Sequence, residues 1–170
     1  MSAKTSSDSD TNRVEERREK DRPAILAPPP ILLVVVVLAA VVADRFVPLP
    51  LVQNNLRFLL GAAALAVGLA IGFSAVREFR SHREHPSPYK PTNAIVDSGI
   101  YGVSRNPIYL SFFVIVLAVA FFVNSWWVVI AIVPLFLLLR FGVIAAEERY
   151  LSNKFGAPYD DYRRRVRRWI

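Results

Sequence analysis

Two long apolar segments, at about 107–123 and 126–146, are separated only by Asn124 and Ser125. Each is close to the roughly 20 residues that a helix needs to cross the hydrocarbon core of a bilayer. A connection of two residues between such helices is compatible only with an antiparallel hairpin. The chain as a whole is 54% hydrophobic, which is too apolar for an ordinary soluble domain. This hairpin therefore predicts a membrane protein.

Two further apolar segments precede the hairpin, at about Ile25–Ala43 and Leu56–Val76. With the hairpin they predict an all-α integral membrane bundle of about four transmembrane helices. Pro134 should kink the last of these helices, because proline removes a backbone hydrogen bond. In the second segment, small residues recur every four positions on one face, which lets a neighbouring helix approach closely. These small residues are Ala64, Gly68 and Gly72.

Lysine and arginine are distributed unevenly between the two sides of the predicted bundle. Residues 1–22 carry six of them, 77–105 five and 147–170 seven, whereas 44–57 carries two. Because cytoplasmic loops are enriched in basic residues, both termini are predicted to be cytoplasmic, in a bacterial inner membrane. The net charge of +7 flanks lipid-spanning segments. Membrane lipids rather than nucleic acid are therefore the expected partners.

The two ends of the chain differ in composition from the apolar segments. Residues 1–24 are polar and predict a disordered cytoplasmic tail, which leaves 25–170 as the folded membrane domain. Near the C-terminus, Phe155–Pro158 should separate two short helices, because glycine favours a helix end and proline prevents continuation. The second helix is amphipathic and is predicted to pack on the cytoplasmic surface of the bundle. Its apolar face consists of Tyr159, Tyr162, Val166 and Trp169.

Charged residues lie at the polar ends of the hairpin. Arg105 precedes Asn106 and Pro107, which are a favoured N-cap and a favoured first helical residue. Glu147 and Glu148 follow the second apolar segment, so the hairpin can bring them beside Arg105. Charges at membrane depth are candidates for function, but Arg105 could also be an arginine that extends to the interface, and the glutamates a solvated exit turn. Adjacent helical residues point about 100° apart, so one glutamate is expected to face inward and the other water.

Several other chemistries find no support in the sequence. The chain has no cysteine, which excludes a thiolate zinc site and a cysteine nucleophile. His82 and His85 share one polar loop without further ligands nearby, so no metal site is expected. No glycine-rich phosphate loop or nucleophile elbow occurs.

The polar motifs and their spacing resemble those of a known superfamily. Gly-x-Tyr-x-x-Ser-Arg-Asn-Pro-x-Tyr spans 99–109, and after the hairpin Glu-Glu-x-x-Leu-x-x-x-Phe-Gly-x-x-Tyr-x-x-Tyr-x-x-x-Val-x-Arg begins at Glu147. This pattern, from about Thr92 to the C-terminus, resembles the membrane-embedded methyltransferases, which include isoprenylcysteine carboxyl methyltransferases and phospholipid methyltransferases. The resemblance implies S-adenosylmethionine in a cytoplasm-facing pocket formed by the last hairpin and the C-terminal segment. It also implies a lipophilic methyl acceptor that arrives from the bilayer.

The resemblance assigns roles to individual residues. Arg105 and Glu148 would be the catalytic pair, with Arg105 orienting a carboxylate of the cofactor or of the substrate. One of the two glutamates would hold the cofactor's amino group or ribose hydroxyls. The residues that would contact the cofactor are Tyr101, Arg105, Asn106, Pro107, Tyr109, Glu147 and Glu148.

The chain departs from the family pattern at a few positions. Asn106 stands where many members have histidine, Ile100 replaces a usual proline, Gly102 often appears as arginine, and Ser111 stands where glycine is common. Two alternatives therefore remain open, a nicotinamide-dependent membrane reductase and a non-catalytic membrane protein of the same fold. The acceptor, either a prenylated-cysteine-like carboxylate or a phospholipid-like amine, and the oligomeric state are also open.

Overall fold

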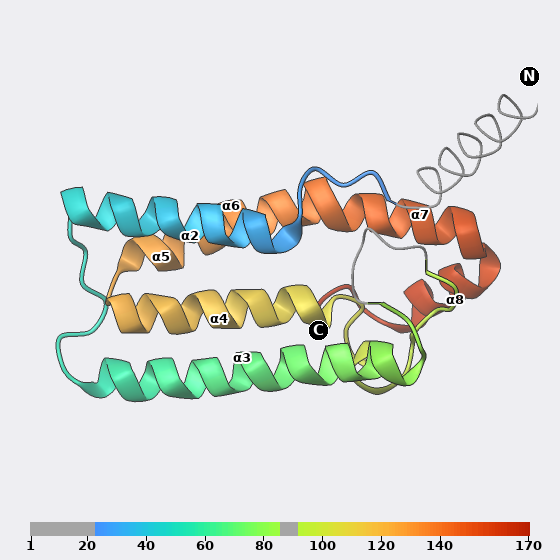
Figure 1. Cartoon of the computed structure of the whole chain (residues 1–170), viewed down its shortest axis with the longest axis horizontal. Helices are drawn as coiled ribbons and strands as arrows, with labels where there is room; N and C mark the ends of the chain where they lie inside the picture. Colours follow the sequence, from blue (N-terminus) through green and yellow to red (C-terminus); the bar gives the residue numbers. More distant parts are fainter. Residues whose placement is uncertain (1–22, 86–91) are drawn as a thin grey trace, which may run out of the picture.

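The computed structural model describes residues 23–85 and 92–170, and within these residues all regular structure is helical (Figure 1). The predicted tail at 1–24 therefore lies almost entirely outside the described residues. The all-α prediction is confirmed. The long helices run side by side along the molecule; they are α2 (Pro29–Phe46), α3 (Leu56–Ser81), α4 (Pro107–Val123) and the segmented run Trp126–Phe155.

The last run is longer than predicted and consists of four segments. These are α5 (Trp126–Ile130), α6 (Ile132–Leu139), the π-helical turn η2 (Arg140–Ile144) and α7 (Ala145–Phe155). The first interruption falls at Ala131, three residues before Pro134, because Pro134 has no N–H to continue the ladder. The π turn is stabilised from outside the helix, where the backbone N–H of Leu26 donates to the carbonyl of Gly142 at 2.9 Å.

Among the residues that the structure describes, three helices are long and apolar enough to cross a membrane, namely α2, α3 and the run Trp126–Phe155. Many of their large apolar side chains are exposed, for example Leu38 and Phe73. An exposed apolar surface of this extent fits contact with lipid. The fourth predicted span, α4, has 17 residues, so the count of four stays a prediction.

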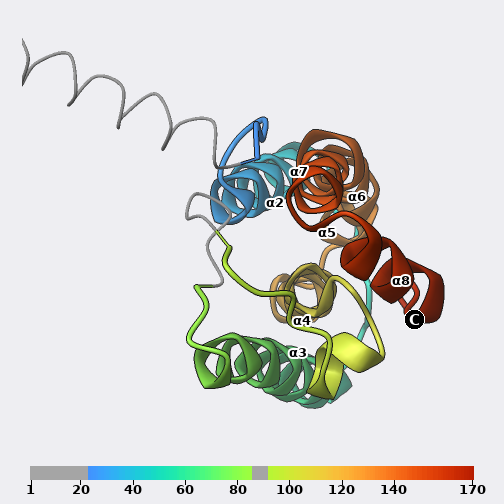
Figure 2. The same cartoon turned by 90° about the vertical axis from the view of Figure 1, so that its right-hand side faces the viewer.

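Helices α3 and α4 pack closely through the small residues of α3, and Figure 2 shows them side by side. A Cβ added at Gly68 would lie 2.8 Å from Cγ1 of Ile115, and one at Gly72 would lie 3.2 Å from Oγ of Ser111. The predicted close approach of a helix to this face is therefore confirmed. Ser111 is small enough to preserve this contact.

The hairpin turn has the predicted position. Asn124 ends α4 in the left-handed conformation with φ 59°, and the hydroxyl of Ser125 caps α5 by accepting from the backbone N–H of Trp127 at 3.2 Å. The side-chain oxygen of Asn124 also accepts from the backbone N–H groups of Leu51 and Val52. The turn thus lies against the α2–α3 connection, at one end of the bundle.

The C-terminal segment forms the opposite end of the molecule. Helix α7 ends at Gly156, which has φ 61°, and α8 (Ala157–Arg165) follows as predicted. Tyr159 and Tyr162 are buried on α8, as predicted, but the other two residues of the predicted apolar face, Val166 and Trp169, lie beyond the end of the helix at Arg165. Beyond Arg165 the chain leaves the helix and runs back toward the start of α4.

Candidate active site

A cavity of about 430 Å³ lies between the start of α4, helices α7 and α8, and the segment that precedes α2. Six of the seven residues assigned from the sequence motifs line it: Tyr101, Arg105, Asn106, Tyr109, Glu147 and Glu148. The seventh, Pro107, is fully buried and begins α4, where its missing N–H costs nothing. The topology therefore brings the two sequence motifs to one cavity.

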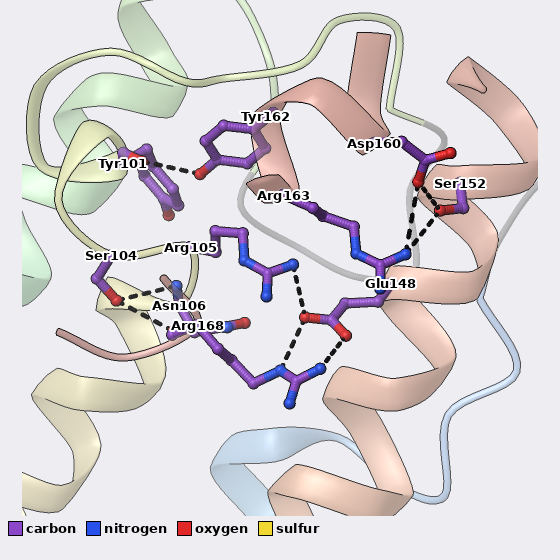
Figure 3. A network of polar contacts seen from close by, with 10 residues as sticks. All are labelled: Tyr101, Ser104, Arg105, Asn106, Glu148, Ser152, Asp160, Tyr162, Arg163 and Arg168. Carbon is purple, nitrogen blue, oxygen red and sulfur yellow. Dashed lines mark hydrogen bonds and ion pairs between the residues drawn. The ribbon is translucent and has the colours of Figure 1, made fainter. Parts of the chain in front are cut away.

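Glu148 is bound by two arginines from different parts of the chain (Figure 3). Its Oε1 lies 3.0 Å from Nη1 of Arg105, and Arg168 donates through Nε at 2.9 Å and Nη2 at 2.6 Å to the two carboxylate oxygens. The Arg168 contact is the bidentate arrangement that the planar guanidinium favours. The hydrogen bond with Glu148 raises the pKa of Arg168 above its ordinary value, so this group stays charged.

Arg105 points into the protein rather than along the surface. Its side chain is only 10% exposed. Its Nη1 is ion-paired with the carboxylate of Glu148, whereas its buried Nε has no hydrogen-bond acceptor among residues 23–85 and 92–170. Buried donors without acceptors are rare and call for a partner. The alternative of an arginine that extends to the interface does not fit this geometry, and the guanidinium is positioned to receive an additional oxygen ligand.

Glu147 and Glu148 both line the cavity, so the expectation that one of them would face water is wrong. The two side chains diverge as adjacent helical residues must, but each finds a partner within the protein. Glu147 accepts a hydrogen bond from the hydroxyl of Tyr109 at 2.7 Å, whereas Glu148 contacts the two arginines. The cavity is wide enough for both glutamate side chains to line it. The two carboxylates therefore have different environments.

The C-terminal extension, residues 166–170, has no regular secondary structure and is attached to the motif before α4 by backbone and side-chain hydrogen bonds. The backbone N–H of Arg105 donates to the carbonyl of Arg167 at 3.0 Å. The carbonyl of Arg168 accepts from Nδ2 of Asn106 at 3.0 Å and from the hydroxyl of Ser104 at 3.3 Å. Asn106 and Ser104 thus position the C-terminal extension that carries Arg168. An amide at position 106 supplies the donor that this contact requires.

Tyrosines form another wall of the cavity. The hydroxyl of Tyr162 donates to the carbonyl of Tyr101 at 2.9 Å, which fixes α8 to the short 3-10 helix η1 (Gly99–Gly102). Tyr101 also packs edge-on against Phe79, with ring centroids 5.1 Å apart. Burial raises the pKa of Tyr159 to about 12 and that of Tyr162 above its ordinary value. These hydroxyls therefore remain neutral hydrogen-bonding groups near neutral pH.

Sequence reasoning missed two contributors to this site. The sequence predicted a surface helix that continues to Trp169, but α8 ends at Arg165 and the extended backbone after it places Arg168 against Glu148. In extended backbone, side chains two residues apart lie on the same face. The spacing of Val166 and Arg168 is therefore the signal that could have indicated that Arg168 points toward the protein. The second contributor is the proline-rich segment that enters α2, which lines the cavity with Pro23 and Pro28 before the helix and with Pro29 and Pro30 at its start.

Comparison with known proteins agrees with this geometry. Residues 56–158 match the family model described as phospholipid methyltransferase. The match begins at the start of α3, so the family likeness extends well before Thr92, where the motifs begin. A curated protein of Haemophilus influenzae, described as uncharacterized, is 36% identical over 62 residues, which is 36% of this chain and 98% of that protein. No solved structure matches the chain. The family model covers more than half of the chain, and the protein therefore belongs to the phospholipid methyltransferase family.

Proposed function

We propose that this protein transfers a methyl group from S-adenosylmethionine to a lipophilic acceptor at the cytoplasmic face of a bacterial inner membrane. Membership of a methyltransferase family supports the reaction class. The observation that carries the proposal is Arg105 at the wall of a cavity lined by Glu147 and Glu148: its buried Nε has no hydrogen-bond acceptor among the residues that the structure describes.

The groups around the cavity fit the chemistry of S-adenosylmethionine. Its carboxylate suits the guanidinium of Arg105, whose planar donors bind a carboxylate and whose Nε has no acceptor among the described residues. Where the methyl acceptor is a carboxylate, which needs no base, Glu147 would accept hydrogen bonds from the cofactor's amino group or ribose hydroxyls. The aromatic side chains that line the cavity suit the adenine ring and the sulfonium charge. The cavity volume of about 430 Å³ lies in the range of small-molecule sites.

The cofactor would supply an electrophilic methyl group, and the protein would supply alignment and a dry environment. Arg105 would hold the carboxylate of the methyl donor in a fixed position, while the C-terminal extension and α8 would exclude water from the cavity. Glu148 is bound to two arginines and is unsuited to accept a proton. Glu147 accepts one hydrogen bond, from Tyr109. If the acceptor is an amine, Glu147 is the carboxylate that we propose removes its proton.

The lipophilic character of the acceptor rests on the other walls of the cavity. Ile108 and Phe112 of α4 and Pro29 and Pro30 at the start of α2 give it an apolar side. An acceptor with a lipid tail would enter from this side, and its polar end would reach the carboxylates.

The cofactor can be tested by titrating the purified chain in detergent with S-adenosylmethionine, S-adenosylhomocysteine and NADPH in a calorimeter. We expect the two adenosyl ligands to bind at one site and NADPH to give no heat. Binding of NADPH alone would contradict the proposal and favour a reductase.

The acceptor can be tested with methyl-labelled S-adenosylmethionine and membranes that contain the protein. The labelled lipids are extracted and treated with mild base, which hydrolyses carboxyl methyl esters to methanol but leaves N-methyl groups intact. Label in either fraction supports methyl transfer and distinguishes the two acceptor classes. Absence of label from all lipids, in membranes whose protein binds the cofactor, would contradict a lipid acceptor.

A further inference from the structure

A second cavity, of about 300 Å³, lies on the other side of Glu148 from the candidate active site. The two cavities share Glu148 as a common wall, but their other charged residues differ. The second cavity is lined by four arginines and one glutamate, together with two small polar side chains and an alanine. The residues are Arg140, Ala145, Glu148, Arg149, Ser152, Asn153, Arg163 and Arg168.

The positive charge of this cavity is only partly balanced by the protein. Arg168 is bound to Glu148, and Arg163 contacts Asp160 and Ser152. Arg140 and Arg149 have no carboxylate partner within the part of the chain that the structure describes, although the guanidinium of Arg140 lies 5.3 Å from the ring centroid of Phe141. The cavity therefore has a surplus of guanidinium donors around a space large enough for a small anion.

The depth of these arginines indicates where the anion comes from. Arg140 belongs to the apolar run Trp126–Phe155, where an unpaired charge is costly in lipid. A helix rises 1.5 Å per residue, so Arg149 lies about 14 Å further along the axis. A run of roughly 20 residues from Trp126 crosses the hydrocarbon core, which leaves Arg149 at the level of the lipid headgroups. Arg140 can extend its side chain toward the same level.

We propose that this cavity binds the phosphate of an anionic membrane lipid. Arginines are suited to phosphate oxygens because their donors are planar and paired, and Ser152 and Asn153 supply further polar groups. The bound lipid lies on the far side of Glu148 from the methyl-transfer cavity, so it is not the methyl acceptor. Its phosphate balances the charges of Arg140 and Arg149 at the membrane surface, where residues 23–85 and 92–170 supply no carboxylate to them.

The proposal can be tested by native mass spectrometry of the full chain in detergent with a short-chain phosphatidylglycerol and the matching phosphatidylcholine. The wild type should retain one phosphatidylglycerol in preference to phosphatidylcholine. The double variant Arg140→Gln, Arg149→Gln removes the two arginines of this cavity that have no carboxylate partner among the described residues, and neither of them lines the active-site cavity. Loss of one arginine near the membrane surface should weaken phosphatidylglycerol binding roughly fivefold, and loss of both about thirtyfold.

The matched control is Arg77→Gln, Arg80→Gln, which removes two exposed charges from the end of α3. It should bind phosphatidylglycerol as the wild type does. Equal binding by the Arg140, Arg149 variant, or an equal loss in the control, would overturn the proposal. Inorganic phosphate is added as a competitor, and displacement of the lipid at equal concentration would assign the site to free phosphate instead. Retained S-adenosylmethionine binding by the variant separates this test from that of the methyltransferase activity.

Discussion

Nη1 of Arg105 lies 3.0 Å from Oε1 of Glu148, although the whole α4–α7 hairpin separates them in the sequence. The same carboxylate is bound by Arg168 from the C-terminal extension (Figure 3). Three segments of the chain thus meet at one buried carboxylate. Because Nε of Arg105 has no acceptor among the described residues, this ion pair lies beside a donor that can still bind a ligand.

Replacing Arg105 by lysine should weaken S-adenosylmethionine binding almost as much as replacing it by alanine. A charge-assisted contact contributes about 1.5–3 kcal/mol, which corresponds to roughly ten- to a hundredfold in affinity. Lysine retains the charge but cannot reproduce the planar pair of donors. Calorimetric titration of each variant measures the change, and Arg80→Lys, at an exposed position of α3, is the control. Wild-type affinity in Arg105→Lys would show that the guanidinium is not the ligand for the carboxylate.

Replacing Glu148 by glutamine should destabilise the protein much more than replacing Glu147 by glutamine. Glu148→Gln leaves Arg105 and Arg168 close together without the anion that binds them, and breaking a buried ion pair costs about 3–5 kcal/mol. Glu147→Gln retains an oxygen that accepts from Tyr109. Thermal unfolding in detergent, followed by circular dichroism, should give a clearly lower midpoint for Glu148→Gln. Similar midpoints for the two variants would mean that the ion network adds little to stability.

The sequence predicted those parts of the fold that depend on local patterns. The bounds of α4 and the turn at Asn124 and Ser125 follow from a proline, an apolar run and a residue that tolerates positive φ. The expected cap by the side chain of Asn106 does not form, because its amide donates to the carbonyl of Arg168 instead. The hairpin then placed Arg105 beside the glutamates by topology alone. For these features, residues close in the sequence carry all the required information.

The parts that were not predicted depend on packing between distant segments. The π turn at Arg140–Ile144 is accompanied by a hydrogen bond from Leu26 to Gly142, and neither position shows this in the sequence. Arg168 joins the site only because α8 ends at Arg165, within a run of arginines that would continue a helix equally well. The part of the site formed by the two motifs was therefore predictable. The part formed by the C-terminal extension and the proline-rich segment was not.

Reporter fusions at Gln53 and after Ile170 should lie on opposite sides of the membrane. Gln53 lies in the connection between α2 and α3, and Asn124 binds that connection through Leu51 and Val52. Helix α4 therefore runs from the active-site end to the other end of the bundle, and its 17 residues extend about 26 Å. A fluorescent protein and a periplasmic phosphatase fused at each position report the side. Both reporters on one side would mean that α4 does not span the membrane.

Removing residues 167–170 should abolish S-adenosylmethionine binding, because the backbone carbonyls of this C-terminal extension hold the motif that forms the site. The carbonyl of Arg167 accepts from the backbone of Arg105, and the carbonyl of Arg168 accepts from Asn106 and Ser104. Two substitutions separate the backbone from the side chains. Arg167→Ala keeps the carbonyl and loses only an exposed side chain, so it should bind the cofactor as the wild type does.

Arg168→Ala keeps the backbone contacts but removes the bidentate partner of Glu148, so its affinity should fall between those of Arg167→Ala and the deletion. The expected order arises because the deletion frees both the backbone donors of the motif and the Glu148 carboxylate, whereas Arg168→Ala frees only the carboxylate. Calorimetric titration of the three variants at one temperature measures this order. A deletion variant that binds S-adenosylmethionine as tightly as Arg167→Ala would show that the C-terminal extension is not part of the cofactor site.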